Sequence, residues 1–446
     1  MVKVITYGTY DLLHYGHINL LERAKALGDY LIVGVTSDDY DKSRGKINNQ
    51  QSIMDRVNAV KATGIADEVI IEEYDGQKID DIRRYGVDIF TVGSDWEGKF
   101  DYLNEYCKVV YLPRTEGVSS SDIRTQCRKI KIGIVGESGR ICEKFVRESS
   151  FVNGCDVVGI YSDKETSLDL SFKTDDYEKL LNNVDAVYVA SHPTQHYAHI
   201  KKALLSGKHV MCEAPVAMTV SECQELFKLA AEKKLVLMDA IKTAYATAYE
   251  RLLLLIKGGV IGDVISIDAT CTSLKNIREA TAAELKDMWN SVCSWGPTAL
   301  LPVFQLLGTS YINKRIVSAF VDEDKTFDYF TKVDFIYDSA TASVKVGKGI
   351  KSEGELIISG TKGYIYVPAP WWKTDYFEIR FENPVENKRC FYQLNGEGIR
   401  YEIVAFLKSI DSEFVFNNIS ENISCSICKI VEDLNNRCDF AEIGRK

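Results

Sequence analysis

Residues 3–17, KVITYGTYDLLHYGH, decide the first part of the fold. The stretch opens on KVITY, which has the β-branched and aromatic content of a buried strand, and a turn containing Gly8 follows it. Beyond residue 17, apolar residues recur at helical spacing and stop at Gly28: Ile18, Leu21, Ala24 and Leu27. The segment therefore predicts a strand, a glycine-containing turn and a helix.

The same order of strand and helix continues to about residue 128. Short apolar stretches alternate with helical patterns, which is typical of a parallel sheet with crossover helices. The expected strands are 31–35, 68–73, 88–93 and 108–113. A second start of this kind opens at 130–135, IKIGIV, and further expected strands are 156–162, 185–191, 209–215 and 235–240.

After about residue 250 the pattern changes to alternating strands joined by turns, which favours an antiparallel sheet. The expected strands are 264–273, 315–324, 332–349, 354–359 and 363–369, and a helical stretch at 399–437 follows. A length of 446 residues favours about three domains. We therefore expect an α/β protein: a Rossmann-like domain (1–128), a second Rossmann-like domain (129–248) and an α+β domain with a large antiparallel sheet (249–446).

Composition excludes several classes of function. The chain has 64 acidic and 54 basic residues and a formal net charge of −10, so it lacks the basic excess that nucleic-acid binding requires. The first residues predict a strand instead of a secretory signal, and the apolar run 252–256 is too short to span a bilayer. The 12 cysteines show no paired framework. We expect a cytoplasmic protein with reduced thiols and no membrane span.

The sequence predicts no metal site of its own. A CxxC pair at Cys425 and Cys428 lacks a second pair with zinc-ligand spacing. Three nearby histidines, His192, His196 and His199, accompany a strand end and the following helix start, where a structural role is the better interpretation.

The pair His14 and His17 is the sharpest chemical signal. Both lie where the first strand gives way to a helix N-terminus, whose N–H groups and dipole favour a phosphate group. Two imidazoles there can donate to phosphate oxygens as charge develops in a transition state. Gly16 between them removes a side chain that would block close approach.

These residues resemble the cytidylyltransferase superfamily through the pattern HxGH, and further blocks narrow the resemblance to the glycerol-3-phosphate cytidylyltransferase family. RTEGVSSS at 114–121 resembles the second signature of that family, and 92–103, 36–40 and Arg56 also match. The resemblance covers about the first 128 residues and implies transfer of CMP from CTP to a polyol phosphate with release of pyrophosphate. It favours glycerol 3-phosphate over ribitol or another alditol phosphate, and products of this kind serve cell-wall teichoic acid or capsule synthesis.

The resemblance also implies roles for individual residues. The expected catalytic residues are His14, His17, Lys46 and Arg114. The expected CTP-binding residues are Gly8, Thr9, Tyr10, Asp11, Gly16, Gly93, Asp95, Thr115, Ser119 and Ser120. The residues expected near the acceptor or in support of the site are Asp38, Arg44, Arg56 and Asp67. Mg²⁺ is expected to bind mainly to the CTP phosphates. A non-catalytic binding protein that retains nucleotide folds is the alternative from another class.

The second strand–turn–helix start carries an altered dinucleotide motif, IVGESGRIC at 134–142. Gly136 and Gly139 are separated by two residues instead of one, and Cys142 stands at the third glycine position. Asp163 at the end of the next strand suits a ribose 2′-hydroxyl. It favours NAD(H), while its neighbours Ser162 and Lys164 leave NADP(H) open.

Residues 184–226 and 354–372 resemble the glucose–fructose oxidoreductase and inositol dehydrogenase family (Gfo/Idh/MocA), over about 130–440. The resemblance adds Glu213 to the expected cofactor-binding residues and implies a homo-oligomer formed through the C-terminal sheet. The lysine of the family's EKP motif is Ala214 here, and its D-x-G-x-H residues align with Ser294 and Thr298. No histidine follows residue 209.

Two interpretations of the second module stay open. Loss of general acid–base groups, each worth about 10²- to 10⁴-fold, favours a catalytically impaired module that serves oligomerisation or ligand sensing. The alternative is an NAD(P)H-dependent reductase that supplies the polyol phosphate, with Lys242 or Tyr245 as proton donor.

Overall fold

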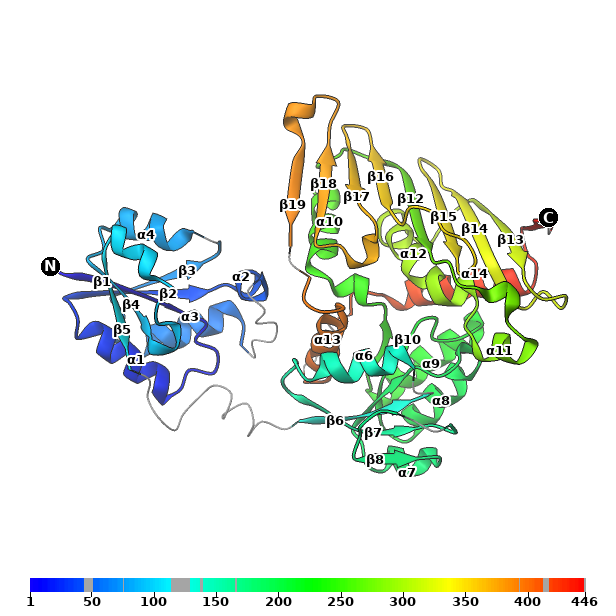
Figure 1. The fold of residues 1–446 in the computed structure, drawn as a ribbon, viewed down its shortest axis with the longest axis horizontal. Helices are drawn as coiled ribbons and strands as arrows, with labels where there is room; N and C mark the ends of the chain where they lie inside the picture. Colours follow the sequence, from blue (N-terminus) through cyan, green and yellow to red (C-terminus); the bar gives the residue numbers. More distant parts are fainter. Residues whose placement is uncertain are drawn as a thin grey trace. The chain divides into compact units, whose positions relative to one another are not determined.

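The computed structural model describes residues 1–43, 51–74, 76–113, 129–136, 139–164, 167–392, 394–411 and 417–444. The chain divides into two compact units, Met1–Lys129 and Ile130–Lys446 (Figure 1). The α/β fold class expected from the sequence is confirmed in both units.

The first unit is built on a five-stranded sheet in the order β3-β2-β1-β4-β5, in which every neighbouring pair is parallel. Its strands are β1 (Lys3–Gly8), β2 (Tyr30–Thr36), β3 (Glu68–Glu72), β4 (Ile89–Gly93) and β5 (Lys108–Leu112). Its helices are α1 (Tyr15–Lys25), α2 (Asp38–Ser43), α3 (Ile53–Ala62), α4 (Gln77–Tyr85) and the 3₁₀ turns η1 (Ser94–Trp96) and η2 (Asp101–Glu105). The parallel sheet expected from the alternating pattern is therefore present.

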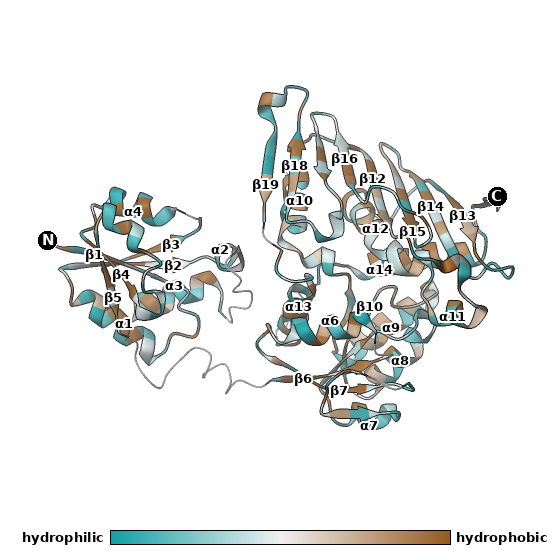
Figure 2. Cartoon of the chain, viewed as in Figure 1, coloured by the Kyte–Doolittle hydropathy of each residue, from teal (hydrophilic) through white to brown (hydrophobic). Residues whose placement is uncertain are grey.

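Burial of the central strands forms the core of this unit. Val4 and Ile5 of β1 are fully buried, and so are most residues of β2, because helices cover both faces of the sheet. Figure 2 shows hydrophobic residues concentrated along these central strands. Gly34 permits close packing of β2 on β1, since a Cβ there would lie 2.2 Å from the ring of Tyr7.

The second unit contains two sheets. The first is parallel, in the order β11-β10-β9-β6-β7-β8. Its strands are β6 (Ile130–Val135), β7 (Cys155–Tyr161), β8 (Phe172–Thr174), β9 (Ala186–Val189), β10 (His209–Glu213) and β11 (Leu237–Ala240). The helices that accompany it are α6 (Arg140–Ser149), α7 (Tyr177–Leu181), α8 (Pro193–Leu205), α9 (Val220–Lys233) and η3 (Lys242–Tyr245).

The other sheet has nine strands in the order β19-β18-β17-β16-β12-β15-β14-β13-β20. Its strands are β12 (Val264–Thr272), β13 (Asn313–Phe320), β14 (Asp328–Ile336), β15 (Thr341–Gly347), β16 (Leu356–Gly360), β17 (Tyr364–Val367), β18 (Tyr376–Arg380), β19 (Lys388–Phe391) and β20 (Phe440–Glu442). The helices around it are α10 (Thr247–Lys257), η4 (Ile277–Glu279), α11 (Ala282–Asp287), α12 (Ser291–Leu307), η5 (Trp371–Lys373), η6 (Pro384–Glu386), α13 (Ile399–Asp411) and α14 (Glu421–Asn435).

This sheet differs in two respects from the expected antiparallel one. Most neighbours are antiparallel, but β12 pairs with β15 in parallel, and β20 returns after α14 to pair in parallel with β13, so the sheet is mixed. The helical stretch expected at 399–437 is divided between α13 and α14. The boundary expected near residue 248 inside this unit stays a prediction.

Candidate functional site

The two histidines of the sequence motif lie together at the N-terminus of α1. His14 is the residue before the helix, and its Nδ1 accepts a hydrogen bond from the amide of Gly16 at 3.1 Å. The imidazole rings of His14 and His17 stack with centroids 3.9 Å apart. Because Nδ1 of His14 accepts, a neutral His14 carries its proton on Nε2, where it can be donated to a phosphate oxygen.

The turn between β1 and α1 is built from unusual backbone conformations. Tyr10 and Leu12 have φ values of 52° and 51°, a left-handed region that non-glycine residues seldom adopt. The Tyr10 side chain is buried and meets the ring of His17 edge-on at 5.5 Å. A Cβ at Gly8 would lie 2.9 Å from the Tyr10 ring. Glycine at position 8 therefore lets Tyr10 turn inward beneath the histidine pair.

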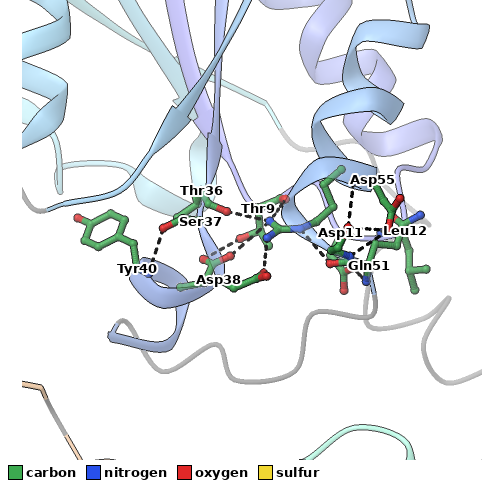
Figure 3. Close-up of polar contacts among 12 residues, drawn as sticks. Thr9, Asp11, Leu12, Thr36, Ser37, Asp38, Tyr40, Gln51 and Asp55 are labelled. Carbon is green, nitrogen blue, oxygen red and sulfur yellow. Dashed lines mark hydrogen bonds and ion pairs between the residues drawn. The ribbon is translucent and has the colours of Figure 1, made fainter. Parts of the chain in front are cut away.

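Arg56 is the centre of a hydrogen-bond network at the same edge of the sheet, and its partners Thr9, Thr36 and Asp38 are labelled in Figure 3. Its side chain is fully buried, and Nη1 donates to the carbonyl oxygens of Thr9 at 2.7 Å and Thr36 at 2.9 Å. It also pairs with the carboxylates of Asp38 and Asp41. The network joins the carboxyl ends of β1 and β2 to the helices α2 and α3.

A second set of contacts fixes the rest of the turn. The amide of Gln51 donates to Oδ1 of Asp11 at 3.0 Å, and the Gln51 side chain accepts from the amide of Leu12 at 2.9 Å (Figure 3). Thr9 donates through Oγ1 to Asp41 at 3.0 Å. The polar groups of Thr9 and Asp11 therefore orient the turn that presents the histidines.

A pocket opens beside Gly8 and Thr9 at the carboxyl ends of the strands. The residues that line it are Tyr7, Gly8, Thr9, Thr36, Lys78, Phe90, Val92, Trp96 and Phe100. The buried ammonium group of Lys78 pairs with Glu72 and lies 4.7 Å from the ring centroid of Tyr7 and 5.6 Å from that of Phe100. A cation and aromatic faces thus meet next to the histidine turn.

The structure brings together many of the residues expected from the sequence, but not all. Those that lie at the carboxyl ends of β1, β2 and β4 or on the adjoining helices are Gly8, Thr9, Tyr10, Asp11, His14, Gly16, His17, Asp38, Arg56, Gly93 and Asp95. Those that fall outside the described residues are Arg44, Lys46, Arg114, Thr115, Ser119 and Ser120.

Asp67 lies elsewhere, which corrects the expectation that it supports the acceptor site. It accepts from the amide of Leu31 at 2.6 Å and pairs with Lys25, and these bonds, the one from Leu31 above all, lower the pKa of its carboxyl group. Leu31 begins the buried part of β2, while the histidine turn follows the carboxyl end of the parallel strand β1. Asp67 therefore fixes the opposite edge of the sheet.

Sequence reasoning missed Lys78, Trp96 and Asp41. Lys78 and Trp96 belong to segments that reach the pocket only through the tertiary fold. Asp41 carries a signal that was available: it stands three residues after Asp38, a spacing that places two carboxylates on one helix face.

In the second unit, the altered glycine motif keeps the features that a dinucleotide needs. Gly136 has a φ of 141°, and a Cβ there would lie 2.6 Å from the amide of Ser191. Gly139 precedes α6, and a Cβ there would meet nothing within 4 Å, so the helix N-terminus is open. Asp163 is exposed two residues after β7. These positions fit an NAD-type dinucleotide.

The structure also describes residues at or near the positions where the resembled oxidoreductase family has its catalytic groups. Ala214 follows β10 and is buried, and Ser294 in α12 donates to the carbonyl oxygen of Trp289 at 3.3 Å. Tyr245 donates to Asn417 at 2.8 Å and is 5% exposed, so its hydroxyl group is engaged in packing. Lys242 lies 3.5 Å from Glu397 and keeps contact with solvent. Both alternative proton donors, Lys242 and Tyr245, stay predictions.

The histidines of α8 are bonded to protein groups. His196 is fully buried between the carbonyl oxygens of Pro215 and Ser191, each 2.8 Å away, and burial lowers its pKa to about 4. His199 contacts Ser191 at 2.9 Å. Within the part of the chain that the structure describes, no group of three or more His, Cys, Asp or Glu residues is arranged to hold a metal ion.

Comparisons with known proteins match a different family to each of the two units. The family model "Cytidylyltransferase-like" matches residues 5–126, and the model "Oxidoreductase family, NAD-binding Rossmann fold" matches residues 130–240. Glycerol-3-phosphate cytidylyltransferase of Bacillus spizizenii is 51% identical over 124 residues, which are 28% of this chain and 95% of that protein. The corresponding enzyme of Staphylococcus aureus is 47% identical over 126 residues, again 28% of this chain and 95% of that protein.

The second unit has the fold of an oxidoreductase. The crystal structure of a 3-ketoreductase from Actinomadura kijaniata in complex with NADP and TDP-benzene superposes with a TM-score of 0.61 at 17% identity, covering 72% of this chain and 100% of that chain. At that identity the likeness concerns the fold alone.

No helix among the described residues combines the length and hydrophobicity needed to cross a membrane.

Fold, motif and relatives together define the first unit as a nucleotidyltransferase domain, followed by an oxidoreductase-type module. More narrowly, the chain belongs to the glycerol-3-phosphate cytidylyltransferase family through its first unit.

Proposed function

We propose that the first unit transfers CMP from CTP to a polyol phosphate, with glycerol 3-phosphate as the favoured acceptor. The observation that carries the proposal is the stacked pair His14 and His17 at the N-terminus of α1, beside the pocket at Gly8 and Thr9. Relatives named glycerol-3-phosphate cytidylyltransferase align along almost their whole length, which supports the same substrates here.

In this reaction the acceptor phosphate attacks the α-phosphorus of CTP in line, and pyrophosphate leaves. The helix N-terminus and the two imidazoles bind the phosphates and donate hydrogen bonds to oxygens on which negative charge builds up. Positioning and electrostatics suffice for nucleotidyl transfer, so no covalent enzyme intermediate is required. Lys46 and Arg114 stay predicted partners of the triphosphate.

We assign the acceptor to the pocket that contains Lys78. Its ammonium group, which also pairs with Glu72, lies in the pocket wall and can donate a hydrogen bond to the acceptor phosphate, and Thr9 and Thr36 supply hydroxyl groups for a polyol. Phe100 and Trp96 form apolar walls that limit the size of the acceptor. The sequence alone did not predict a role for Lys78.

Mg²⁺ in this account binds to the CTP phosphates. The acidic groups near the histidine turn already accept hydrogen bonds or pair with Arg56: Asp11 with Gln51, Asp38 and Asp41 with Arg56. The metal ion would supply charge neutralisation on the triphosphate, and the protein residues would orient the phosphates that carry it.

For the second unit we propose a module that binds NAD(H) or NADP(H) and is catalytically impaired, with a role in ligand sensing or in oligomerisation through its large sheet. Ala214, Ser294 and Thr298 stand where the family has polar catalytic groups, which supports this view. The reductase alternative is supported by the placement of Lys242 beside Glu397.

We further propose a cytoplasmic enzyme whose product feeds cell-wall or capsular polymer synthesis.

Pyrophosphate release tests the proposal. The full chain is incubated with CTP, Mg²⁺ and either glycerol 3-phosphate, ribitol 5-phosphate or glucose 1-phosphate. We expect release with a polyol phosphate and none with glucose 1-phosphate. Release that requires no acceptor, or none with any polyol phosphate, would refute the assignment.

A further inference from the structure

Three lysine side chains of the second unit converge on a single carboxylate oxygen. Oε2 of Glu397 accepts from Lys144 at 3.0 Å, pairs with Lys373 and lies 3.5 Å from Nζ of Lys242. The three lysines come from α6, η3 and η5, which are far apart in the sequence. Tertiary structure alone therefore creates this cluster of positive charge.

The charges in the cluster do not balance. Three ammonium groups face one carboxylate, and the two other carboxyl groups that interact with Lys242 are deeply buried. Burial raises the pKa of Glu213 to about 7 and the pKa of Glu402 well above its ordinary value, so Glu213 is only partly ionised at neutral pH and burial favours the protonated form of Glu402. Glu402 is 1% exposed, and its Oε2 has no hydrogen-bond partner among the residues that the structure describes. Burial and the nearby charge of Lys373 lower the pKa of Lys242, but Lys144 and Lys373 still face a single carboxylate, so an excess of positive charge remains at the cluster.

The cluster is accessible to a small ligand. The side chains of Lys144 and Lys373 are each 32% exposed, that of Lys242 is 22% exposed, and that of Glu397 is 21% exposed. A sealed structural ion pair would exclude water at all four positions, whereas these groups share a surface that solvent reaches.

The segment that carries Glu397 has a special backbone. Gly396 has a φ of 60° and Gly398 a φ of 83°, so a residue in the left-handed region stands on each side of the carboxylate. This segment leads into α13, which packs against α6 and η3, the elements that carry two of the lysines (Figure 1). The two glycines provide backbone freedom through which Glu397 can leave the lysines.

We propose that Lys144, Lys242 and Lys373 bind the phosphate group of a small phosphorylated molecule, and that Glu397 occupies this position in the absence of that ligand. A phosphate dianion balances the excess charge better than one carboxylate does. It also offers three oxygens to three ammonium donors. The inference does not depend on the reaction proposed for the first unit.

This position differs from the 2′-phosphate site of a dinucleotide. The adenosine ribose is expected at Asp163, after β7, while Lys242 follows β11 at the far edge of the sheet. The order β11-β10-β9-β6-β7 separates them by four strand spacings of about 4.8 Å each. The ligand is therefore a second molecule that binds in addition to the dinucleotide.

Hydrogen exchange of the full chain tests this site. Mass spectrometry measures the exchange in peptides that contain Glu397, so a change there reports on the cluster itself. The probes are inorganic phosphate, glycerol 3-phosphate, glycerol and NADPH. We expect both phosphate compounds to change exchange in these peptides, with no change on addition of glycerol. A response to NADPH but not to phosphate would assign the lysines to the dinucleotide and overturn the proposal, as would the absence of any response.

Two substitutions test the role of the carboxylate. Glu397→Gln removes the competing charge and keeps the shape of the side chain. We therefore expect the midpoint, the phosphate concentration that gives half of the change in hydrogen exchange, to fall about tenfold, which corresponds to about 1.4 kcal/mol. Lys373→Gln should raise the midpoint by a similar factor. Lys228→Gln, on the exposed surface of α9, is the matched control and should leave it unchanged. An unchanged or weakened affinity in Glu397→Gln would mean that Glu397 is a structural partner of the lysines.

Discussion

The imidazole rings of His14 and His17 stack with centroids 3.9 Å apart and an interplanar angle of 22°. We propose that the two side chains act on the same phosphates as one unit, so their effects on catalysis are not additive. We expect His14→Ala alone to lower kcat by about 10²- to 10³-fold. The double substitution His14→Ala/His17→Ala should cost little more than the worse single one. Steady-state rates of all three variants decide this, and multiplicative losses would contradict a shared role.

Arg56 is predicted to be essential for the stability of the first unit. It is fully buried between the carbonyl oxygens of Thr9 and Thr36, and it pairs with Asp41, which is also fully buried. Arg56→Met leaves that carboxylate without its cation and should cost about 3–5 kcal/mol in the free energy of unfolding. Denaturant unfolding of the full chain measures this free energy in the transition of the first unit. Arg83→Met, at an exposed position of α4, should cost less than about 0.5 kcal/mol.

Lys78 is predicted to determine acceptor binding. Because its ammonium group lines the pocket beside Thr9, Lys78→Met should raise KM for the polyol phosphate at least about tenfold, the loss expected when one charge-assisted contact disappears. KM for CTP should stay within about twofold. Lys61→Met, at an exposed position of α3, is the control. A rise in KM for CTP alone would place the nucleotide in this pocket instead of the acceptor.

Glu213 is predicted to make the stability of the second unit depend on pH. Burial raises its pKa to about 7, above the value of about 4.5 expected in the unfolded chain. The folded state therefore holds this proton more tightly, and its contribution to stability is complete below about pH 4.5 and is lost as pH rises through 7. Glu213→Gln should reduce the fall in unfolding free energy between pH 5 and pH 8 by about 1–3 kcal/mol. Identical pH profiles of the two proteins would refute this cause.

The second unit is predicted to show little oxidoreductase turnover. With Ala214 in place of the family's lysine and no histidine after residue 209, the chain lacks the general acid–base groups that the family resemblance implies. NADH and NADPH absorbance should stay nearly constant in the presence of dihydroxyacetone phosphate or ribulose 5-phosphate. Turnover at ordinary enzyme rates would favour the reductase alternative, and loss of that turnover in Lys242→Met would then identify the proton donor.

Much of the fold and the histidine turn could be predicted because their signals are local. The strand, Gly8 and the HxGH spacing fall within 15 residues, and each indicates the same strand–turn–helix unit. Asp67 shows how this local reasoning failed. It directly precedes β3, so it lies at the amino edge of a parallel sheet, and that position argued against a role at the carboxyl edge.

Other groups could not be found from sequence because long-range packing places them. The hydroxyl group of Tyr7 donates to Asp81 across 74 positions, and this contact helps to bring α4 with Lys78 to the pocket. Lys144 and Glu397 are 253 positions apart and are joined only by the packing of α13 on α6. No periodicity or spacing rule predicts such pairs.

The central claim is that the first unit is a cytidylyltransferase whose histidine pair carries the chemistry. The most direct test is pyrophosphate release from CTP and glycerol 3-phosphate by His17→Ala, compared with the unaltered chain and with His192→Ala in the second unit. We predict a loss of at least about 10²-fold in His17→Ala, with His192→Ala unchanged. Unchanged release in a correctly folded His17→Ala protein would contradict the account.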